Sequence, residues 1–391
     1  MLMQEQEKAA IASERAGRFE RQQPGGYLAF IPAPLPPPDL RIGASLQALL
    51  SEADVAVGRL DGAVRLVPDP DLFVFMYVRR EAVLSSQIEG TQASLSELLE
   101  FEAQGRQGER TVDLAEVINY VQALRAGLRR LSELPICTRL LCDVHRVLTK
   151  GVRGGEMTRT PGELRRSQNW IGGTGPADAR FVPPPVPEMQ RAMSDLEKFL
   201  NAQKDTPLLV EAGLAHAQFE TIHPFLDGNG RIGRLLITFL LSARGALSRP
   251  LLYLSHHFKL YRDEYYERLQ AVRTKGDWEG WMRFFLAGVA AVAEEATQRA
   301  RKIVLLREEH QRLLREELRR RAGLALDLLD LLMEQPVVTS RLVCNRLGKS
   351  QPTVDKLLSD LAKLGLLRET TGQRWGRRFS YARYLALFEL T

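Results

Sequence analysis

The stretch that decides the fold reads His223-Pro224-Phe225-Leu226-Asp227-Gly228-Asn229-Gly230-Arg231-Ile232-Gly233-Arg234. Pro224 cannot continue a helix, so the chain must turn at this point. Gly228 and Gly230 allow backbone angles that other residues avoid, and successive N–H groups in such a turn point into one concavity that binds anions. An apolar run begins at Ile232, so a second helix follows, and its positive end faces the same concavity. The backbone therefore predicts a phosphate-binding loop between two helices.

The side chains of this loop fit the same chemistry. Arg231 and Arg234 lie three residues apart on one helical face, and two guanidinium groups suit a polyphosphate. Asp227 offers a hard oxygen ligand for Mg²⁺, which usually binds through one carboxylate plus phosphates. His223 can accept a proton near neutral pH. Because the sequence contains no Walker motif GxxxxGK[ST], the P-loop class is excluded. The loop predicts nucleotidyl or phosphoryl transfer without choosing between them.

Composition and charge limit the class of protein. Hydrophobic residues make up 45% and charged residues 26% of 391 residues, as in a globular protein of two or three domains. The three cysteines form no CxxC pair, so we expect reduced thiols in a cytoplasmic protein without structural zinc. Residues 1–23 are polar and the apolar run 232–243 is short and contains Arg234, so we expect neither a signal peptide nor a membrane segment. The net charge of +6 favours an anionic partner such as nucleotide or nucleic acid.

Helical periodicity covers most of the chain between residues 40 and 318. The predicted helices span residues 46–58, 72–88, 95–103, 112–131, 139–148, 186–202, 208–221 and 231–244. A different pattern occurs at 168–185, where two short apolar segments flank a Gly/Pro-rich turn and predict a β-hairpin. The proline-rich residues 30–38 predict an extended arm that packs on the rest of the protein.

The C-terminal part predicts a separate module. A long charged helix over 290–321 is followed by helices at 324–333, 340–347 and 350–363, a short strand at 337–339, and two strands that flank 372–376. Three helices followed by a two-stranded wing are typical of a winged helix. Ten Lys or Arg against seven Asp or Glu give residues 324–391 a net charge of +3. Arg374, Arg377 and Arg378 gather at the wing, and residues 350–356 begin the expected recognition helix, so both DNA binding and protein docking stay open.

The loop sequence resembles the motif HPFx[D/E]GNGRxxR of the Fic family at every specified position. The resemblance implies a protein adenylyltransferase that uses ATP and Mg²⁺ to move AMP onto a Tyr, Thr or Ser hydroxyl of a target protein or of itself. It implies that His223 deprotonates the hydroxyl, that Phe225 is buried to hold the loop, and that Asp227 holds Mg²⁺. The remaining motif residues would bind the phosphates, namely Gly228, Asn229, Gly230, Arg231 and Arg234.

Two flanking segments extend the resemblance. Residues 161–184 resemble the family's flap, whose hairpin edge aligns the target segment by strand addition, and Ile171, Gly172 and Gly173 would lie over the nucleotide. Tyr265 and Tyr266 resemble residues that enclose adenine, although a role as ordinary core aromatics stays open. Arg273 stands where some members have Asn, so one expected contact to the base stays open.

An inhibitory pattern precedes the loop by more than a hundred residues. Residues 85–90, with Ser85 first and Glu89 fifth, fit the family pattern [ST]xxxE[GN]. Gly90 should end a helix and leave Glu89 at its C-terminus, where the macrodipole disfavours a negative charge. The resemblance implies that Arg234 is its partner and that the pair blocks the γ-phosphate. A solvated Glu89, or one that positions a water for AMP removal, stays open.

The sequence thus predicts a mainly α-helical protein with a Fic-type core, a β-hairpin flap and a winged helix. The expected domains are an N-terminal arm and inhibitory region (1–110), a catalytic core (111–290), a linker helix (291–323) and a winged-helix domain (324–391). The main alternatives are a DNA-binding transcriptional regulator and removal of AMP by the same site. The target protein and the oligomeric state, including a homodimer, stay open.

Overall fold

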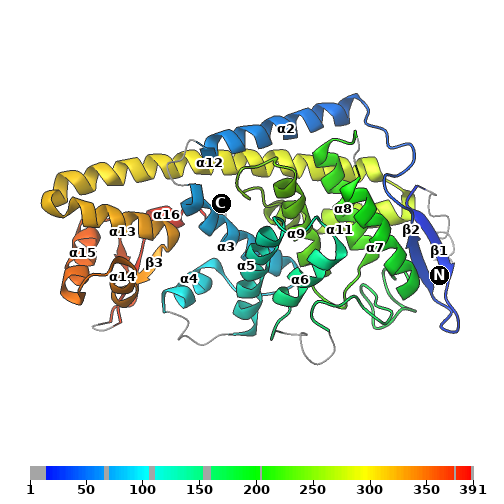
Figure 1. Ribbon diagram of the computed structural model, residues 1–391, viewed down its shortest axis with the longest axis horizontal. Helices are drawn as coiled ribbons and strands as arrows, with labels where there is room; N and C mark the ends of the chain where they lie inside the picture. Colours follow the sequence, from blue (N-terminus) through cyan, green and yellow to red (C-terminus); the bar gives the residue numbers. More distant parts are fainter. Residues whose placement is uncertain are drawn as a thin grey trace.

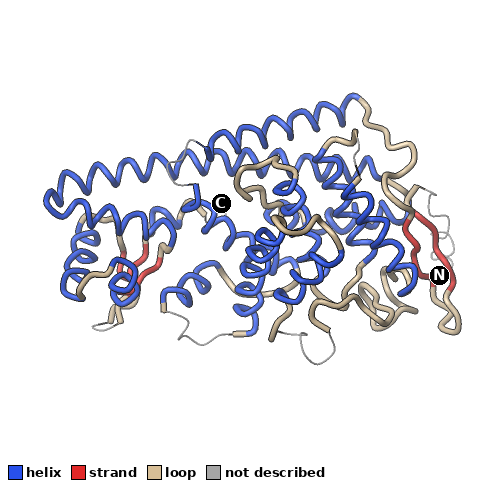
Figure 2. Tube along the Cα trace, in the orientation of Figure 1, coloured by secondary structure: helices blue, strands red, loops and turns tan. Residues whose placement is uncertain are grey.

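The computed structural model describes residues 15–65, 70–104, 111–152, 160–202, 205–373 and 376–388. This part of the chain is mainly helical, as predicted (Figures 1 and 2). Seven helices match predicted segments to within a few residues: α3 (Pro70–Ile88), α4 (Leu95–Ala103), α5 (Val112–Arg130), α6 (Thr138–Leu148), α7 (Val186–Asn201), α8 (Leu208–Ile222) and α9 (Asn229–Ala243). Two shorter helices, α10 (Ser255–Leu260) and α11 (Arg262–Lys275), complete the middle of the chain.

Two long helices run side by side along one edge of the molecule (Figure 1). Helix α2 (Ala44–Arg65) is longer than predicted, and α12 (Trp278–Leu318) begins well before the expected start at residue 290. The side chain of Asp277 accepts a hydrogen bond from the Gly280 N–H and caps α12, so the helix starts inside the core. The predicted boundary at 290/291 falls inside this helix, and the division into domains stays a prediction.

A central pair of helices, α8 and α9, carries the loop at residues 223–228. Every α8 side chain from Leu209 to Ile222 is buried, because other helices cover this helix on all sides. Gly213 allows a close approach, since a Cβ there would lie 2.3 Å from the side chain of Met282 in α12. The two ends of the loop are therefore fixed to the most buried part of the protein.

The N-terminal segment forms a hairpin that the sequence does not predict. Strands β1 (Gly17–Arg21) and β2 (Leu28–Pro32) pair antiparallel, so part of the proline-rich arm is a strand. The Phe30 N–H donates to the Val182 carbonyl at 2.9 Å, and the Phe30 ring packs near Phe181. The hairpin therefore packs against the segment that the sequence predicts as the flap.

The C-terminal module has the predicted winged-helix order. It consists of η1 (Arg319–Arg321), α13 (Ala322–Glu334), β3 (Val337–Thr339), α14 (Ser340–Leu347), α15 (Gln351–Lys363), β4 (Arg368–Glu369), β5 (Arg378–Ser380) and α16 (Ala382–Leu385). Its strands form one antiparallel sheet in the order β3-β5-β4, so β3 joins the predicted two-stranded wing. No helix in the described ranges has the length and apolar character needed to span a bilayer.

The winged helix packs directly against the helices that precede the core. Arg79 of α3 donates to the Glu102 carboxylate at 2.7 Å and to the Glu334 carbonyl at 3.4 Å, and Arg378 pairs with Glu100 at 2.7 Å. The Arg378 side chain is thus already in an ion pair within the protein. Helix α3 therefore contacts the C-terminal module with its middle part and ends near the loop that follows α8.

Candidate active site

The loop between α8 and α9 begins with a histidine in an unusual conformation. His223 ends α8 with φ 49° and ψ 60°, a left-handed conformation that side chains other than glycine rarely adopt. Its carbonyl accepts hydrogen bonds from Arg165 Nε at 3.0 Å and Asn169 Nδ2 at 3.1 Å. These two donors come from the flap side of the site and offset the strain. Such strain is common where a residue must be aimed at a ligand.

Asn229 closes the loop by bonding to both backbone groups of one residue. The Phe225 N–H donates to Asn229 Oδ1 at 2.8 Å, and Asn229 Nδ2 donates to the Phe225 carbonyl at 2.7 Å. The same carbonyl accepts from Asn169 Nδ2 at 2.9 Å. The Asn229 amide is thus engaged within the loop, and its predicted contact with the α-phosphate stays a prediction. The chain turns again at Gly228, which has φ 76° and is the residue directly before α9.

His145 of α6 supports the loop from below and was not singled out in the sequence. Its ring stacks on the fully buried Phe225 ring at 3.9 Å between centroids. Because the Gly162 N–H donates to His145 Nδ1 at 2.9 Å, the ring proton is on Nε2, which donates to the Asp227 carbonyl at 3.1 Å. Burial lowers the pKa of His145 to about 4, so the ring is neutral at physiological pH.

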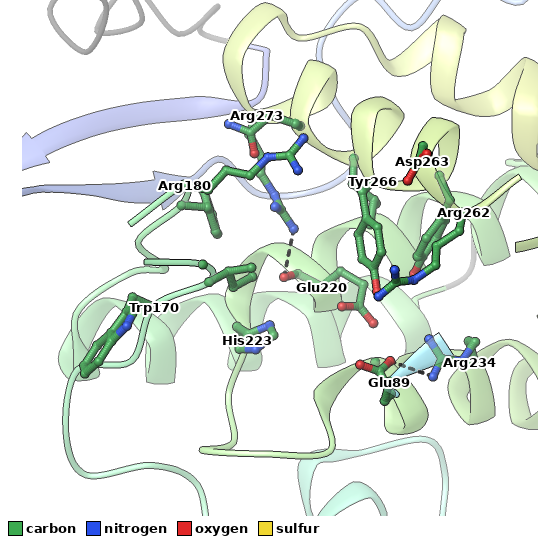
Figure 3. A pocket seen from close by; sticks show the side chains of 17 residues that line it. Glu89, Trp170, Arg180, Glu220, His223, Arg234, Arg262, Asp263, Tyr266 and Arg273 are labelled. Atoms are coloured by element: carbon green, nitrogen blue, oxygen red, sulfur yellow. Dashed lines mark hydrogen bonds and ion pairs between the residues drawn. The ribbon is translucent and has the colours of Figure 1, made fainter. Parts of the chain in front are cut away.

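A cleft of about 560 Å³ opens above the loop (Figure 3). Its walls come from α3, the flap, α8, α9 and α11. The lining residues are Glu89, Trp170, Ile171, Gly172, Arg180, Phe181, Glu220, His223, Gly230, Arg234, Arg262, Asp263, Tyr265, Tyr266, Leu269, Gln270 and Arg273. Most of the predicted site residues thus share one cavity. The other predicted site residues are not among the lining residues, namely Ser85, Gly173, Asp227, Gly228, Asn229 and Arg231.

The predicted pair of Glu89 and Arg234 is present. Arg234 Nη2 donates to Glu89 Oε1 at 2.8 Å and to the Ser85 carbonyl at 2.9 Å, while its Nε donates to Ser85 Oγ at 2.8 Å. Burial acts to lower the pKa of Arg234, but the Glu89 carboxylate together with Tyr265, Tyr120 and Glu220 raises that pKa above its usual value. A Cβ on Gly230 would lie 2.2 Å from Glu89 Oε1, so the carboxylate rests against the first turn of α9. A negative charge already sits where the loop would bind a phosphate.

His223 faces the cleft as a neutral imidazole. Burial, together with the nearby Arg273 and Arg165 guanidinium groups, lowers its pKa to about 3. Among the described residues, none forms a hydrogen bond with its buried Nδ1 atom. A neutral imidazole has one unprotonated ring nitrogen, which can accept a proton.

Arg231 pairs with Asp227 and Glu116, whereas Arg234 pairs with Glu89. The Arg231 guanidinium is buried, 3.5 Å from a Glu116 oxygen and 3.6 Å from Asp227 Oδ2. The Asp227 side chain is 38% exposed. Within the described ranges, no group of three or more His, Cys, Asp or Glu side chains forms a metal cage. A single accessible carboxylate suits Mg²⁺, which takes its other ligands from phosphate and water.

The two tyrosines of α11 differ in their surroundings. Tyr265 is buried, its hydroxyl lies 2.9 Å from His216 Nε2, and its ring stacks on Phe258 at 4.5 Å. Tyr265 therefore belongs largely to the core, while one part of it reaches the cleft wall. Tyr266 is half-buried and faces the cleft, with the Arg262 guanidinium 5.4 Å from its ring centroid.

The flap is less regular than the predicted β-hairpin. Only Ile171 and Phe181 form a pair of antiparallel bridge hydrogen bonds in this described segment, at 2.9 and 3.2 Å. The Asp178 carboxylate instead accepts bonds from the N–H groups of Thr174 and Gly175, which curls the tip of the segment. These local bonds compete with a longer ladder. Gly173 packs against Asp178 rather than lining the cleft.

Two solved structures have the same fold. A Fic family protein from Desulfovibrio desulfuricans G20 aligns over 88% of this chain and 98% of its own, with a TM-score of 0.56 and 20% identity. Fic-1 from Caenorhabditis elegans aligns over 67% of this chain and 74% of its own, with a TM-score of 0.50 and 21% identity. The fold and the loop thus define a Fic-fold protein.

Sequence profiles agree with this class. The Fic/DOC family N-terminal domain matches residues 47–129, the Fic/DOC family domain matches 135–241, and the IclR helix-turn-helix domain matches 325–371. The chain thus carries the two Fic/DOC family domains, followed by a C-terminal helix-turn-helix domain.

Curated relatives match over a shorter region. The protein adenylyltransferase Fic of Culex quinquefasciatus is 36% identical over 125 residues, which are 32% of this chain and 22% of that protein. A probable protein adenylyltransferase of Aquifex aeolicus is 27% identical over 176 residues, 45% of this chain and 51% of that protein. The chain thus spans between about a fifth and a half of the length of these relatives.

Proposed function

We propose that this protein is an adenylyltransferase that moves AMP from ATP to a Tyr, Thr or Ser hydroxyl of a target protein or of itself. The observation that carries the proposal is the shared cleft, into which His223, the first turn of α9 and Arg234 all open. A proton acceptor thus lies beside a site suited to phosphate groups. The names of the curated relatives supply the choice of AMP as the transferred group.

In the proposed reaction, neutral His223 takes the proton of the target hydroxyl. The hydroxyl oxygen bonds to the α-phosphorus as the bond to the oxygen bridging the α- and β-phosphates breaks, and pyrophosphate leaves with that electron pair. Bound phosphates raise the pKa of His223 from its low value, because nearby anions favour the protonated ring. The proton then passes from His223 to solvent.

Charge on the phosphates is met by groups of this chain. The N–H groups at Gly228–Gly230 and the Arg234 guanidinium would hold the phosphates, while Arg231 pairs with Asp227 and Glu116. Asp227 would hold Mg²⁺, which supplies charge neutralisation on the α- and β-phosphates when bound. Ile171 and Gly172 of the flap would cover the nucleotide, and Gly173 would shape the turn beside them.

We propose that Glu89 inhibits this reaction. Its carboxylate occupies the first turn of α9 and engages Arg234, so a γ-phosphate would meet a negative charge and an arginine that is already paired. Ser85 accepts two further hydrogen bonds from the same arginine. Removal of AMP with help from Glu89 stays the alternative for this site.

The test compares wild type, Glu89→Gly and His223→Ala in Mg²⁺ with ATP labelled at either the α- or the γ-phosphate. Glu133→Gly, which removes an exposed glutamate paired with Arg130, is the control for Glu89→Gly. We expect protein-bound label from the α-phosphate only, stronger in Glu89→Gly and absent in His223→Ala. Label from the γ-phosphate would indicate phosphoryl transfer, and no label in any variant would contradict the proposal.

DNA binding by the winged helix is a second candidate function. It is favoured by the match to the IclR helix-turn-helix domain and by the exposed first turn of α15, where Gln351, Thr353 and Lys356 face solvent while Val354 is buried. The predicted cluster of wing arginines is weaker than expected, because Arg378 pairs with Glu100 and Arg374 lies outside the described residues.

The salt dependence of binding to duplex DNA tests this function. A Lys356→Ala variant should weaken binding and reduce the salt slope, since a lysine–phosphate contact releases counterions. Lys198→Ala, which changes a lysine on α7, should leave binding unchanged. Absence of binding to duplex DNA at low salt would exclude this function.

A further inference from the structure

The cleft contains a buried carboxylate that the proposed transfer does not use. Glu220 lies on α8, one turn before His223, and its side chain lines the cleft although the residue is only 7% exposed. Oε1 is buried without a hydrogen-bond partner among the described residues, and no hydrogen bond or ion pair of those residues involves its carboxyl group. Arg273 bonds to the Glu220 backbone carbonyl, at 3.0 Å, rather than to its side chain.

The fold makes room for this carboxylate. A Cβ on Gly233 would lie 2.4 Å from Glu220 Oε1, so a glycine in α9 lets the carboxylate approach the helix. Burying a carboxylate without hydrogen bonds is unfavourable. Burial accordingly raises the pKa of Glu220 to about 7, although the Arg234 cation acts in the opposite direction. A buried carboxyl group without hydrogen bonds in a cavity wall indicates a functional site, in which a bound ligand supplies the missing hydrogen bonds.

The position of Glu220 limits which part of a nucleotide it meets. Figure 3 shows its carboxylate between the Glu89–Arg234 pair on one side and Tyr266 on the other. The first side is the phosphate-binding end of the cleft, and the second is its aromatic wall. A nucleotide phosphate is largely deprotonated at neutral pH, so it offers a carboxylate few donors and repels it by charge. In any nucleotide, the sugar is the group that joins the phosphates to the base.

We propose that the Glu220 carboxyl group accepts hydrogen bonds from the ribose hydroxyls of the bound nucleotide and makes the cleft selective for ribonucleotides over deoxyribonucleotides. This inference rests on the proposed function, because that function brings a nucleotide into the cleft. Ribose hydroxyls supply the donors that the carboxyl group lacks in the protein. Glu220 is thus a specificity-determining residue that leaves the proton transfer to His223.

The competing interpretation is a structural one, in which Glu220 serves only as a nearby counter-charge for Arg234. The two interpretations differ in a measurable ratio. Loss of a counter-charge changes the affinity for every nucleoside triphosphate by the same factor. Loss of a ribose acceptor weakens binding of ATP and leaves binding of an analogue without the hydroxyl nearly unchanged.

The experiment uses the full chain with Glu89→Gly, so that the cleft accepts triphosphate. Equilibrium binding of ATP, 2′-deoxy-ATP and 3′-deoxy-ATP is measured by calorimetry in this parent and after adding Glu220→Gln or Glu220→Asp. Glu211→Gln is the matched control, because Glu211 is a buried carboxylate on the same helix that lies outside the cleft lining. Thermal unfolding of each variant checks that it is folded.

We expect the parent to bind ATP on the order of 10-fold more tightly than at least one deoxy analogue, as for a hydrogen bond to a charged group. Glu220→Gln should reduce that ratio to roughly 3 or less, Glu220→Asp should reduce it partly, and Glu211→Gln should preserve it. An equal ratio in Glu220→Gln and its parent, or a parent without any preference, would overturn the inference.

Failure of the proposed function has a different signature. If the parent binds ATP with ribose selectivity but transfers no label, then adenylyl transfer is wrong and the role of Glu220 stands. If label is transferred equally well from ATP and both deoxy analogues, then only the role of Glu220 is wrong.

Discussion

The Arg234 guanidinium donates a hydrogen bond of 2.8 Å to the Glu89 carboxylate, and the two residues are 145 positions apart in the chain. Two further bonds from Arg234 go to Ser85, so one arginine of α9 is bound twice by the last turns of α3. The Arg234 side chain is 2% exposed and the Glu89 side chain is 33% exposed. The pair is therefore anchored on the arginine side and accessible on the glutamate side, which suits a contact that can open.

Ser85 should contribute to the inhibitory contact. Ser85→Ala leaves the buried Nε of Arg234 without its partner, at a cost of about 1–3 kcal/mol. We expect a looser arginine and labelling from α-labelled ATP that lies between wild type and Glu89→Gly. Ser86→Ala is the matched control, because the Ser86 hydroxyl is buried without a partner among the described residues. Equal labelling in the two serine variants would argue against a role for Ser85.

The closure of the loop by Asn229 should be essential for transfer. In the Glu89→Gly background, Asn229→Ala removes both hydrogen bonds to the backbone of Phe225. We expect at least a roughly 100-fold fall in the initial rate of labelling, because a misplaced catalytic group loses about that much. Asn201→Ala removes a comparable pair of amide–carbonyl bonds at the end of α7 and should leave the rate unchanged. A rate that survives Asn229→Ala would show that the loop keeps its shape without this residue.

How much of this site the sequence predicts depends on where the supporting groups lie. The loop and its flanking helices follow from a short contiguous pattern, and the Glu89–Arg234 pair follows from the resemblance of two such patterns to those of the Fic family. His145, Arg165 and Asn169 support the loop from positions 54 to 82 residues away, and no local pattern marks such contacts. Glu220 lies next to the motif, but the helical periodicity of the sequence does not distinguish it from other polar residues of the helix.

The missed features of the fold have similar causes. Strand β1 is short and polar, and it pairs with β2. Its sequence shows no clear alternation of apolar and polar residues, so no strand is predicted there. The flap was predicted as a regular hairpin because its apolar segments are visible, whereas the bonds from Asp178 that curl it are side-chain contacts. Helix α12 begins directly after its cap residue, Asp277. The charged stretch that predicts a helix in the sequence starts later, so the sequence predicts only the second half of α12.

Glu81 should make stability depend on pH. This fully buried carboxyl accepts bonds from the hydroxyls of Tyr120 and Ser255, and burial raises its pKa to about 7. Because the folded pKa exceeds the unfolded value, the folded state binds more protons between about pH 4.5 and 7. The stability from Glu81 is therefore present at low pH and is lost as the pH rises through 7.

Urea unfolding of wild type and Glu81→Gln from pH 5 to 8 checks this dependence. The quantity compared is the unfolding free energy of wild type minus that of Glu81→Gln. It should fall by on the order of 1 kcal/mol per pH unit as the pH rises toward 7. The subtraction cancels the other titrating groups, including the neutral buried histidines. A difference that is independent of pH would mean that Glu81 keeps an ordinary pKa.

Arg79 should hold the winged helix against α3. Arg79→Ala breaks its ion pair with Glu102 and its bond to the Glu334 carbonyl, and should lower the unfolding free energy by about 3 kcal/mol. Arg191→Ala, at an exposed pair 3.8 Å long with Glu188, should cost less than about 1 kcal/mol. Chemical denaturation measures both. Similar values for the two variants would indicate that the interface contributes little to stability.

We propose that this cleft transfers AMP and that Glu89 restrains the transfer. The most direct measurement is intact-protein mass spectrometry of wild type, Glu89→Gly and Glu89→Gly/His223→Ala after incubation with Mg²⁺ and ATP. We predict a gain of one or more adenylyl groups in Glu89→Gly, much less in wild type and none in the double variant. A mass gain that persists without His223, one that equals a phosphoryl group, or none in Glu89→Gly while an active relative is modified in parallel, would contradict the account.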